Sequence, residues 1–307
     1  MTSIVIWRNR ACLVLAIELT GLATVFTAPS SSARAEDGST PDPGIPDKSG
    51  YSLFDPTPDD QMRKFTPDRP TKGFSVRTID AGHFELETDV VSYTYSKYLG
   101  IATRSVQALD PNLKIGITNW ADLEVQFNGL QSSRSFESVS GVTLAHGAGF
   151  GDVFLRMKMN LFGNDDGPAG LAVIPYVKLP SSVPVISNGA VEGGLIAPLA
   201  LRLPQDYIVT LMTEVDALKN ADNNRRYANF VNLVGVSHPL PGIEGANAMI
   251  ELYSSAGTDP ATPPIYTFDV GMNFRLDEHT ILDLGLNLGL NKAAPKAQIY
   301  TGVSVRF

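Results

Sequence analysis

Alternation of apolar and polar residues is the feature that most constrains how this chain can fold. Leucine occupies every second position from 282 to 290, and the positions between hold Asp, Gly or Asn. Phe268, Val270, Met272 and Phe274 alternate with Asp, Gly and Asn in the same way. Because successive side chains of a β-strand point to opposite faces, each of these segments has one apolar and one polar face.

The alternation continues from about residue 81 to the end of the chain and predicts twelve strands. They are expected at 83–95, 104–118, 120–130, 150–162, 170–180, 194–203, 206–217, 227–237, 246–254, 265–276, 280–291 and 297–307. Most alternate clearly, but 227–237 shows no preference for one apolar face.

The length of these strands favours a membrane over a soluble core. Apolar runs of about five alternate positions match the roughly 9 to 11 tilted residues with which a strand crosses a bilayer. In hydrocarbon an open sheet would leave two edges of unpaired backbone groups, so the sheet must close. The predicted fold class is all-β: residues 81–307 form a closed antiparallel transmembrane β-barrel of about 12 strands, with its polar faces lining the lumen.

The predicted connections also alternate in length. Outer-membrane barrels have short periplasmic turns and longer external loops. Short even-numbered connections are expected at 119–120, 163–169, 204–205 and 277–279, and longer odd-numbered ones at 131–149, 181–193, 218–226 and 255–264. Two connections depart from the rule, since 239–245 is moderately long and 292–296 is short.

The N-terminus predicts export from the cytoplasm. Arg8 and Arg10 precede a mostly apolar stretch, and an Ala-x-Ala sequence ends at Ala35. A retained membrane helix would hold Glu18 near its middle, at a cost of roughly 2.5 to 3.5 kcal/mol. We therefore expect residues 1–35 to be a cleaved signal peptide.

Composition excludes several kinds of site. The only cysteine, Cys12, lies in the predicted signal peptide, so the mature chain would have no disulfide, thiolate metal site or cysteine nucleophile. The formal net charge of −8 disfavours binding to nucleic acid. No later stretch has the roughly 18 consecutive apolar residues that a membrane helix needs.

Residues 36–80 differ in character from the rest of the chain. They are rich in Pro, Asp, Gly and Ser and lack periodic apolar positions. Such a segment is expected to be extended or disordered. It is either a periplasmic tether or a plug that folds back into the lumen.

Residues 66–95, TPDRPTKGFSVRTIDAGHFELETDVVSYTY, resemble the opening of a bacterial protein family. The resemblance rests on DRP at 68–70, AGHFELE at 81–87 and GFGD at 149–152, and it covers most of 66–307. This family, labelled "putative MetA-pathway of phenol degradation", consists of outer-membrane barrels usually described as transporters. The resemblance implies an outer-membrane location and uptake of small, often aromatic compounds, and it supplies no catalytic residues.

Charged residues on the polar strand faces are the candidate functional residues. Rings of charged side chains select solutes in pores. The alternative is that they pair with one another and fill the interior, because eight strands enclose a filled barrel and sixteen leave a channel. The candidate lumen-lining residues are Asp122, Glu124, Arg156, Lys158, Lys178, Arg202, Glu214, Asp269, Arg275 and Asp283.

Two other functions must be weighed against a channel: an outer-membrane hydrolase acting on lipid, and a secreted soluble all-β binding protein. The only adjacent Ser–His pair is Ser237 and His238, in a predicted turn, and there is no G-x-S-x-G nucleophile elbow. The glycines at 147–152 precede a strand, whereas a dinucleotide-binding loop requires a helix. The histidines are scattered, without metal-ligand spacing, at His83, His146, His238 and His279.

We therefore predict a non-enzymatic outer-membrane transporter or channel for small, hydrophobic or aromatic solutes, without catalytic, cofactor-binding or metal-binding residues. Its expected partners are the solute, outer-membrane lipids and the outer-membrane assembly machinery. The C-terminal aromatic residue Phe307 is the expected point of contact with that machinery.

Overall fold

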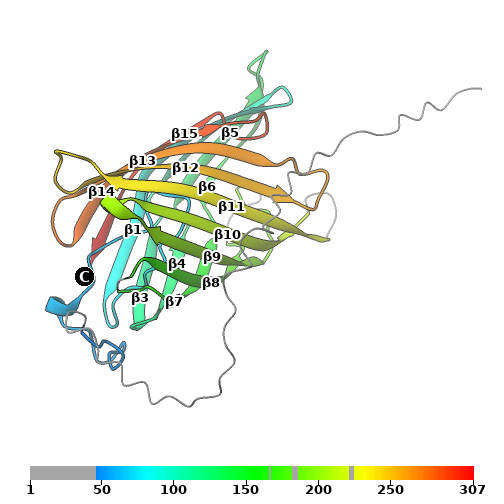
Figure 1. The fold of residues 1–307 in the computed structure, drawn as a ribbon. Helices are drawn as coiled ribbons and strands as arrows, with labels where there is room; N and C mark the ends of the chain where they lie inside the picture. Colours follow the sequence, from blue (N-terminus) through cyan, green and yellow to red (C-terminus); the bar gives the residue numbers. More distant parts are fainter. Residues whose placement is uncertain (1–45, 166, 182–185, 221–224) are drawn as a thin grey trace, which may run out of the picture. The chain divides into compact units, whose positions relative to one another are not determined.

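A computed structural model describes residues 46–165, 167–181, 186–220 and 225–307, and the predicted signal peptide lies outside these ranges. Within them the chain forms fifteen β-strands in one sheet (Figure 1). The strands are β1 (Phe84–Tyr98), β2 (Ile101–Ala108), β3 (Asn112–Thr118), β4 (Ala121–Phe127), β5 (Leu130–Glu137), β6 (Thr143–Phe150), β7 (Val153–Phe162), β8 (Ala169–Leu179), β9 (Glu192–Arg202), β10 (Ile208–Lys219), β11 (Arg226–Pro239), β12 (Ala246–Gly257), β13 (Ile265–Arg275), β14 (Thr280–Gly289) and β15 (Ala297–Arg306). Two short 3-10 helices, η1 (Asp59–Gln61) and η2 (Pro204–Asp206), complete the elements of the described ranges. None of the helices in these ranges is long and apolar enough to cross a membrane.

The sheet closes on itself with twelve strand positions around the wall. Three pairs of consecutive strands, β2 with β3, β4 with β5 and β6 with β7, each form one interrupted strand, because both members pair with the same neighbouring strand position. All neighbours are antiparallel, and β1 pairs with β15 from Glu85↔Arg306 to Tyr95↔Ala297. The predicted closed, antiparallel, twelve-stranded barrel is confirmed.

The three interruptions lie side by side in the wall. The Asn128 amide donates to the Asp152 carbonyl (3.0 Å), and the Gly129 amide donates to the Asp110 carboxylate (3.3 Å). At Gly129 a β-carbon would lie 1.8 Å from the Leu109 carbonyl oxygen, so only glycine allows this close approach. The kinks thus occupy neighbouring strands at one level of the barrel.

The predicted loop at 131–149 is wrong. β5 and β6 cover most of it as a hairpin, and only 138–142 form the turn. These strands, LQSSRSFE and TLAHGAGF, have no continuous apolar face, and many of their side chains are exposed on both faces. A strand without an apolar face has no hydrophobic periodicity to reveal it.

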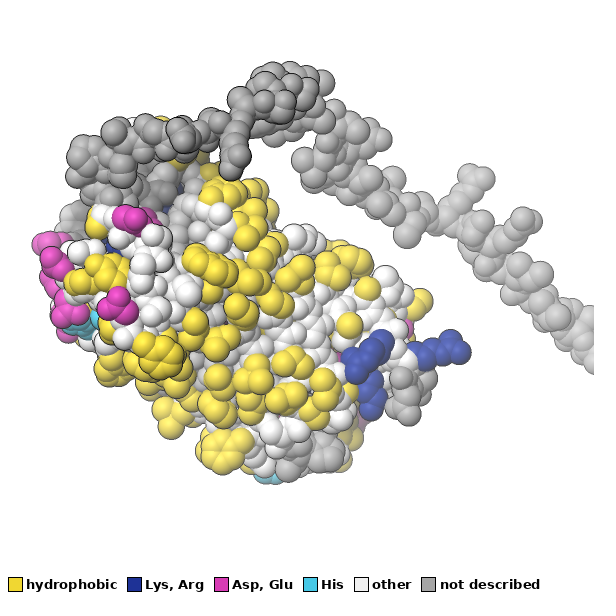
Figure 2. Space-filling model, turned by 90° about the horizontal axis from the view of Figure 1, so that it is seen from below, with side chains coloured by type: hydrophobic (Ala, Val, Ile, Leu, Met, Phe, Trp, Pro, Cys, Tyr) yellow, Lys and Arg dark blue, Asp and Glu magenta, His cyan; other side chains and the backbone are white. Residues whose placement is uncertain are grey.

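The outer face of the barrel is apolar, as the alternation predicts. Leu284 is 47 % exposed and Ile250 is 50 % exposed, whereas the intervening Asp283 and Glu251 are buried on the inner side. Figure 2 shows apolar side chains spread across the middle of one face, with acidic side chains gathered at one end and basic ones at the other. A water-soluble protein would bury these leucines and valines, so this surface is inconsistent with the soluble alternative.

Residues 46–80 contain no named strand and contact the barrel through both backbone and side chains. An isolated bridge, Ser52↔Thr118, and the Thr57 amide bonded to the Ala81 carbonyl (3.0 Å) are among the backbone contacts of the first part of this segment. Its later part, 63–78, contacts side chains of the inner face of the wall. This placement brings the segment to the candidate site.

Candidate functional site: the barrel interior and residues 63–78

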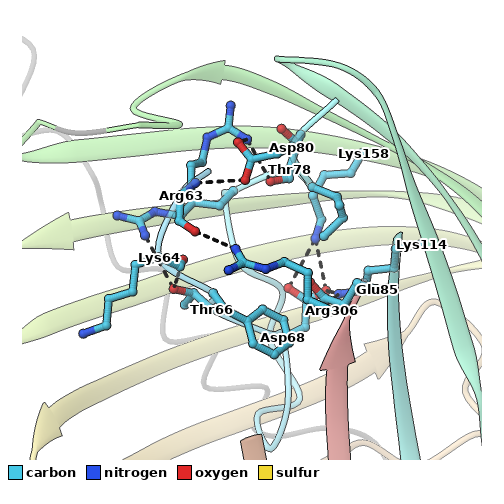
Figure 3. Close-up of a pocket in the computed structure, with 13 residues that line it drawn as sticks. Arg63, Lys64, Thr66, Asp68, Thr78, Asp80, Glu85, Lys114, Lys158 and Arg306 are labelled. Atoms are coloured by element: carbon cyan, nitrogen blue, oxygen red, sulfur yellow. Dashed lines mark hydrogen bonds and ion pairs between the residues drawn. The ribbon is translucent and has the colours of Figure 1, made fainter. Parts of the chain in front are cut away.

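A cluster of buried charges around Asp68 joins residues 63–78 to the wall (Figure 3). Lys114 on β3 and Lys158 on β7 place their ammonium nitrogens 2.7 and 3.0 Å from Asp68 Oδ2. Lys114 also pairs with Glu85 and Glu87 of β1. The two lysines and two glutamates are at most 3 % exposed, so this is a network of charges removed from water.

The environment of Asp68 favours its ionised form. Burial opposes ionisation, but the Lys114 and Lys158 ammonium groups outweigh burial and hold the pKa of Asp68 well below its usual range. The Ser75 amide also donates to Asp68 Oδ1 (2.5 Å). The carboxylate therefore links two barrel strands to a turn of residues 63–78.

A second set of ion pairs joins the segment to β1, β13 and β14. Arg69 donates two parallel hydrogen bonds to Asp283 (2.9 and 2.8 Å) and pairs with Asp89. Lys72 lies 2.8 Å from Asp269. Burial lowers the pKa of Lys72, and the Asp269 carboxylate opposes this effect. Residues 68–72 thus contact opposite sectors of the wall through one acidic and two basic side chains, Asp68, Arg69 and Lys72.

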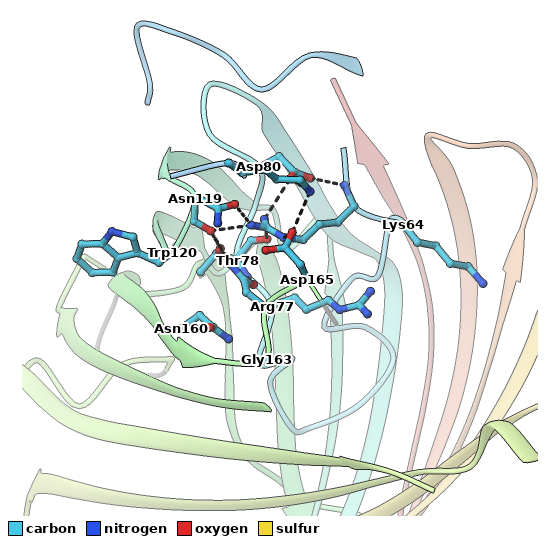
Figure 4. Close-up of polar contacts among 12 residues, drawn as sticks. Lys64, Arg77, Thr78, Asp80, Asn119, Trp120, Asn160, Gly163 and Asp165 are labelled. Carbon is cyan, nitrogen blue, oxygen red and sulfur yellow. Dashed lines mark hydrogen bonds and ion pairs between the residues drawn. The ribbon is translucent and has the colours of Figure 1, made fainter. Parts of the chain in front are cut away.

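A third contact lies beside the turns that join β3 to β4 and β7 to β8 (Figure 4). Arg63 donates to Asp165 (3.0 Å) and to the Asn119 carbonyl (2.7 Å), and Lys48 lies 2.9 Å from the same Asp165 carboxylate. Burial raises the pKa of Asp165, but its hydrogen bond with Lys48 and the charge of Arg63 lower it below the usual range. Three groups of charged contacts therefore hold the segment: one around Asp68, one around Arg69 and Lys72, and one around Arg63.

The inner face is not uniformly polar. Five buried apolar residues on four consecutive strands form what we call the apolar sector: Ile174 on β8, Ile196 on β9, Met212 on β10, and Val231 and Leu233 on β11. Phe74, Tyr176 and Tyr253 pack against it. The expectation of a wholly polar lumen is therefore wrong for this sector, and two apolar faces on β11 explain why 227–237 shows no facial preference.

The structure brings most of the ten candidate residues to the inner face, in different surroundings. Glu124 and Lys158 pair at 3.2 Å, and Asp122 accepts the Ile79 amide (2.9 Å). Asp269 and Asp283 bind Lys72 and Arg69, as described above. Some of the ten candidate residues thus bind the segment and others bind neighbouring residues of the wall. They do not form a single ring of charged side chains around the lumen.

The other candidates lie nearer the ends or beside the apolar sector. Lys178 pairs with Asp152 (3.3 Å) and Glu192 (2.7 Å), and Arg202 donates to the Gly163 and Gly167 carbonyls. Arg275 donates to the Phe65 carbonyl. Glu214 and Arg156 interact electrostatically with each other.

Several residues of the site were not among the predicted candidates, including Lys114 on β3 and Glu85 and Glu87 on β1. Four others are Asp68, Arg69, Lys72 and Phe74. These four lie in the segment without periodicity, where strand patterns carry no information. The one available signal was the DRP sequence at 68–70, which resembles the family motif.

The Ser237–His238 pair cannot form a catalytic dyad in this geometry. The two are consecutive residues of β11, so their side chains leave opposite faces. His238 Nε2 lies 2.9 Å from the Gln205 carbonyl oxygen, and its ring stacks 4.2 Å from Tyr207. In the described ranges no group of three or more His, Cys, Asp or Glu residues could hold a metal ion.

Comparison with known families identifies the class of protein. Residues 67–307 match the family described as "Putative MetA-pathway of phenol degradation", and the chain belongs to that family. No curated protein matches the sequence.

Among solved structures, one with a TM-score above 0.5 shows the same fold. The COG4313 outer membrane channel from Pseudomonas putida F1 is 15% identical, with a TM-score of 0.58 over 73% of this chain and 95% of that chain. The translocator domain of autotransporter NalP from Neisseria meningitidis is 13% identical (TM-score 0.45, 73% and 88% covered). The beta domain of the Bordetella autotransporter BrkA is 12% identical (TM-score 0.45, 72% and 98% covered). The protein is therefore a closed β-barrel with the fold of an outer membrane channel, and it is a member of the family named above.

Proposed function

We propose that this protein is a channel that passes small hydrophobic or aromatic solutes across the outer membrane, and that residues 46–80 plug it. The observation that carries the proposal is the way the segment is held. Residues 63–78 form no strand, and ion pairs to β1, β3, β7, β13 and β14 hold them inside a closed wall. A segment held by side chains can leave without breaking the barrel's backbone ladder.

The solute class draws support from three observations. The family description names phenol degradation, and the solved structure that shares the fold is an outer membrane channel. The apolar sector gives the lumen a hydrophobic surface. Such a surface favours contact with an aromatic ring over contact with a sugar or an ion.

The experiment compares the full-length mature protein with a deletion of residues 46–78 in planar bilayers and in liposomes. The deletion is expected to raise single-channel conductance severalfold and to speed the entry of phenol. A substitution far from the plug, Val139→Ala in the exposed β5–β6 turn, is the control and should behave as the wild type. Equal conductance in all three would reject the plug, and absence of any solute flux in all three would reject the channel.

Export and assembly complete the proposal. Residues 1–35 would direct the chain across the inner membrane. The outward leucines and valines would contact lipid, and the exposed Phe307 at the end of β15 would engage the assembly machinery. The short turns after β3, β7 and β13 support a periplasmic location for that end of the barrel.

A further inference from the structure

An aromatic ring already packs against the apolar sector, and it belongs to Phe74 of the plug. Phe74 packs against the sector, and the neighbouring Gly73 lies beside Leu233, where a β-carbon would be 3.4 Å from the leucine side chain. The Arg156 guanidinium lies 5.3 Å from the Phe74 ring centroid, and Lys158 Nζ lies 5.9 Å from it. Cations at these distances are attracted to the face of a ring.

Arg156 has hydrogen-bonding capacity that the described residues do not use. Its Nε and Nη1 atoms are shielded from solvent and have no hydrogen-bond partner among the described residues. A second ring, Phe154, lies 5.1 Å from the same guanidinium. Buried donors without partners are costly, so they mark a place where an acceptor from outside would be bound strongly.

Two carboxylates of β10, Glu214 and Asp216, lie beside the apolar sector. Glu214 on β10 pairs in register with Ile196 and Val231 of the apolar sector, and it interacts electrostatically with Arg156. Asp216, two residues further, accepts a hydrogen bond from the Tyr176 hydroxyl (2.7 Å). An anionic ligand would meet these two carboxylates, whereas a hydroxyl could donate to one of them while accepting from Arg156.

We propose that Phe74 occupies a solute-binding site, and that its natural competitor is a neutral aromatic compound bearing a hydroxyl group. The ring replaces Phe74 against the apolar sector, and the hydroxyl oxygen accepts from Arg156 and donates to Glu214. This inference rests on the proposed function, since it specifies the solute for the same lumen. Binding and displacement of the plug are then one event, because both rings require the same space.

The test measures affinity by calorimetry on the detergent-solubilised mature protein, with phenol, toluene and benzoate as probes. Wild type should bind phenol more tightly than toluene or benzoate. Phe74→Ala removes the competitor and should tighten binding of phenol and toluene by about tenfold. Arg156→Met keeps an apolar side chain but no donor, and it should weaken phenol binding by about tenfold or more and leave toluene binding unchanged.

Two further variants keep the result decisive. Arg202→Met removes a guanidinium with its own carbonyl partners, and it should leave all affinities at wild-type values. Arg156→Lys serves if the Met variant does not fold, and it should weaken phenol binding selectively. Unchanged phenol affinity in Phe74→Ala, or equal effects of the Arg156 variants on phenol and toluene, overturns the proposal.

Measurement of solute flux distinguishes a failure of this inference from a failure of the proposed channel function. If phenol crosses liposomes through the protein but the affinity pattern is absent, the site is wrong and the channel stands. If the affinity pattern holds but no solute crosses with or without residues 46–78, the site stands and the channel is wrong.

Discussion

Lys158 Nζ lies 3.0 Å from Asp68 Oδ2, although the two residues are 90 positions apart in sequence. Lys158 belongs to the barrel wall and Asp68 to the segment that precedes the first strand. Both side chains are buried, so neither charge has water as an alternative partner. Lys114 also pairs with Glu85 and Glu87, and Lys158 also pairs with Glu124, so the lysines keep partners on the wall without Asp68. Removal of the Asp68 charge therefore acts on the docking of the segment.

Asp68→Asn should therefore release the plug. The neutral amide replaces the carboxylate that binds Lys114 and Lys158, and loss of this charge-assisted contact should weaken docking of the segment by about 1.5 to 3 kcal/mol. Planar-bilayer recordings should show more frequent and longer open events than in wild type. Asp59→Asn, in the exposed helix η1 of the same segment, should not change the recordings. A closed Asp68→Asn channel would show that this cluster does not hold the segment.

Acid should open the channel, and neutral pH should not. The charges that face Asp68 are Lys114 on β3 and Lys158 on β7, beside Glu85 and Glu87 on β1. Docking depresses the pKa of Asp68, so the docked state binds fewer protons than the released state. The resulting stabilisation is fully present above the unperturbed aspartate value of about 3.9 and is lost as the pH falls below it towards the docked value.

Conductance measured from pH 8 to pH 2.5 checks this expectation. Wild type should remain closed down to about pH 4 and open at lower pH. The Asp68→Asn variant should show a smaller acid response, because it lacks the carboxylate that titrates. A wild-type opening centred near pH 6 would point to a different group.

Arginine on the outer face should destabilise the barrel in lipid. Val270 is 36 % exposed in the middle of β13, between Leu286 and Ile250 of the neighbouring strands. Val270→Arg should cost about 2 to 4 kcal/mol in a bilayer. Urea titrations of folding into liposomes, followed by heat-modifiable gel mobility, measure the change. Val139→Arg, at an exposed turn, should be neutral, and equal stability of the two variants would contradict a lipid-facing Val270.

The alternating segments gave reliable predictions, because their periodicity reports directly which side chains face lipid. The leucines from 282 to 290 lie outward as the pattern requires, and β14 begins at the predicted residue. The hairpin of β5 and β6 escaped prediction because exposed strands need no apolar face. Asp68 and Phe74 escaped because their partners lie on distant strands and no local spacing encodes the contact.

A cross-link between the segment and the wall should keep the channel closed under conditions that otherwise open it. A β-carbon at position 73 would lie 3.4 Å from Leu233 Cδ2, so cysteines at Gly73 and Leu233 are within reach of a short bifunctional thiosulfonate reagent. The predicted mature chain has no other cysteine, because Cys12 lies in the signal peptide. The cross-linked double variant should remain closed at pH 3, and dithiothreitol should restore opening. Gly73→Cys alone, treated with the same reagent, should open in acid with or without dithiothreitol. If the cross-linked protein conducts at pH 3 as freely as the reduced one, solutes pass without movement of residue 73, and the segment is not the gate.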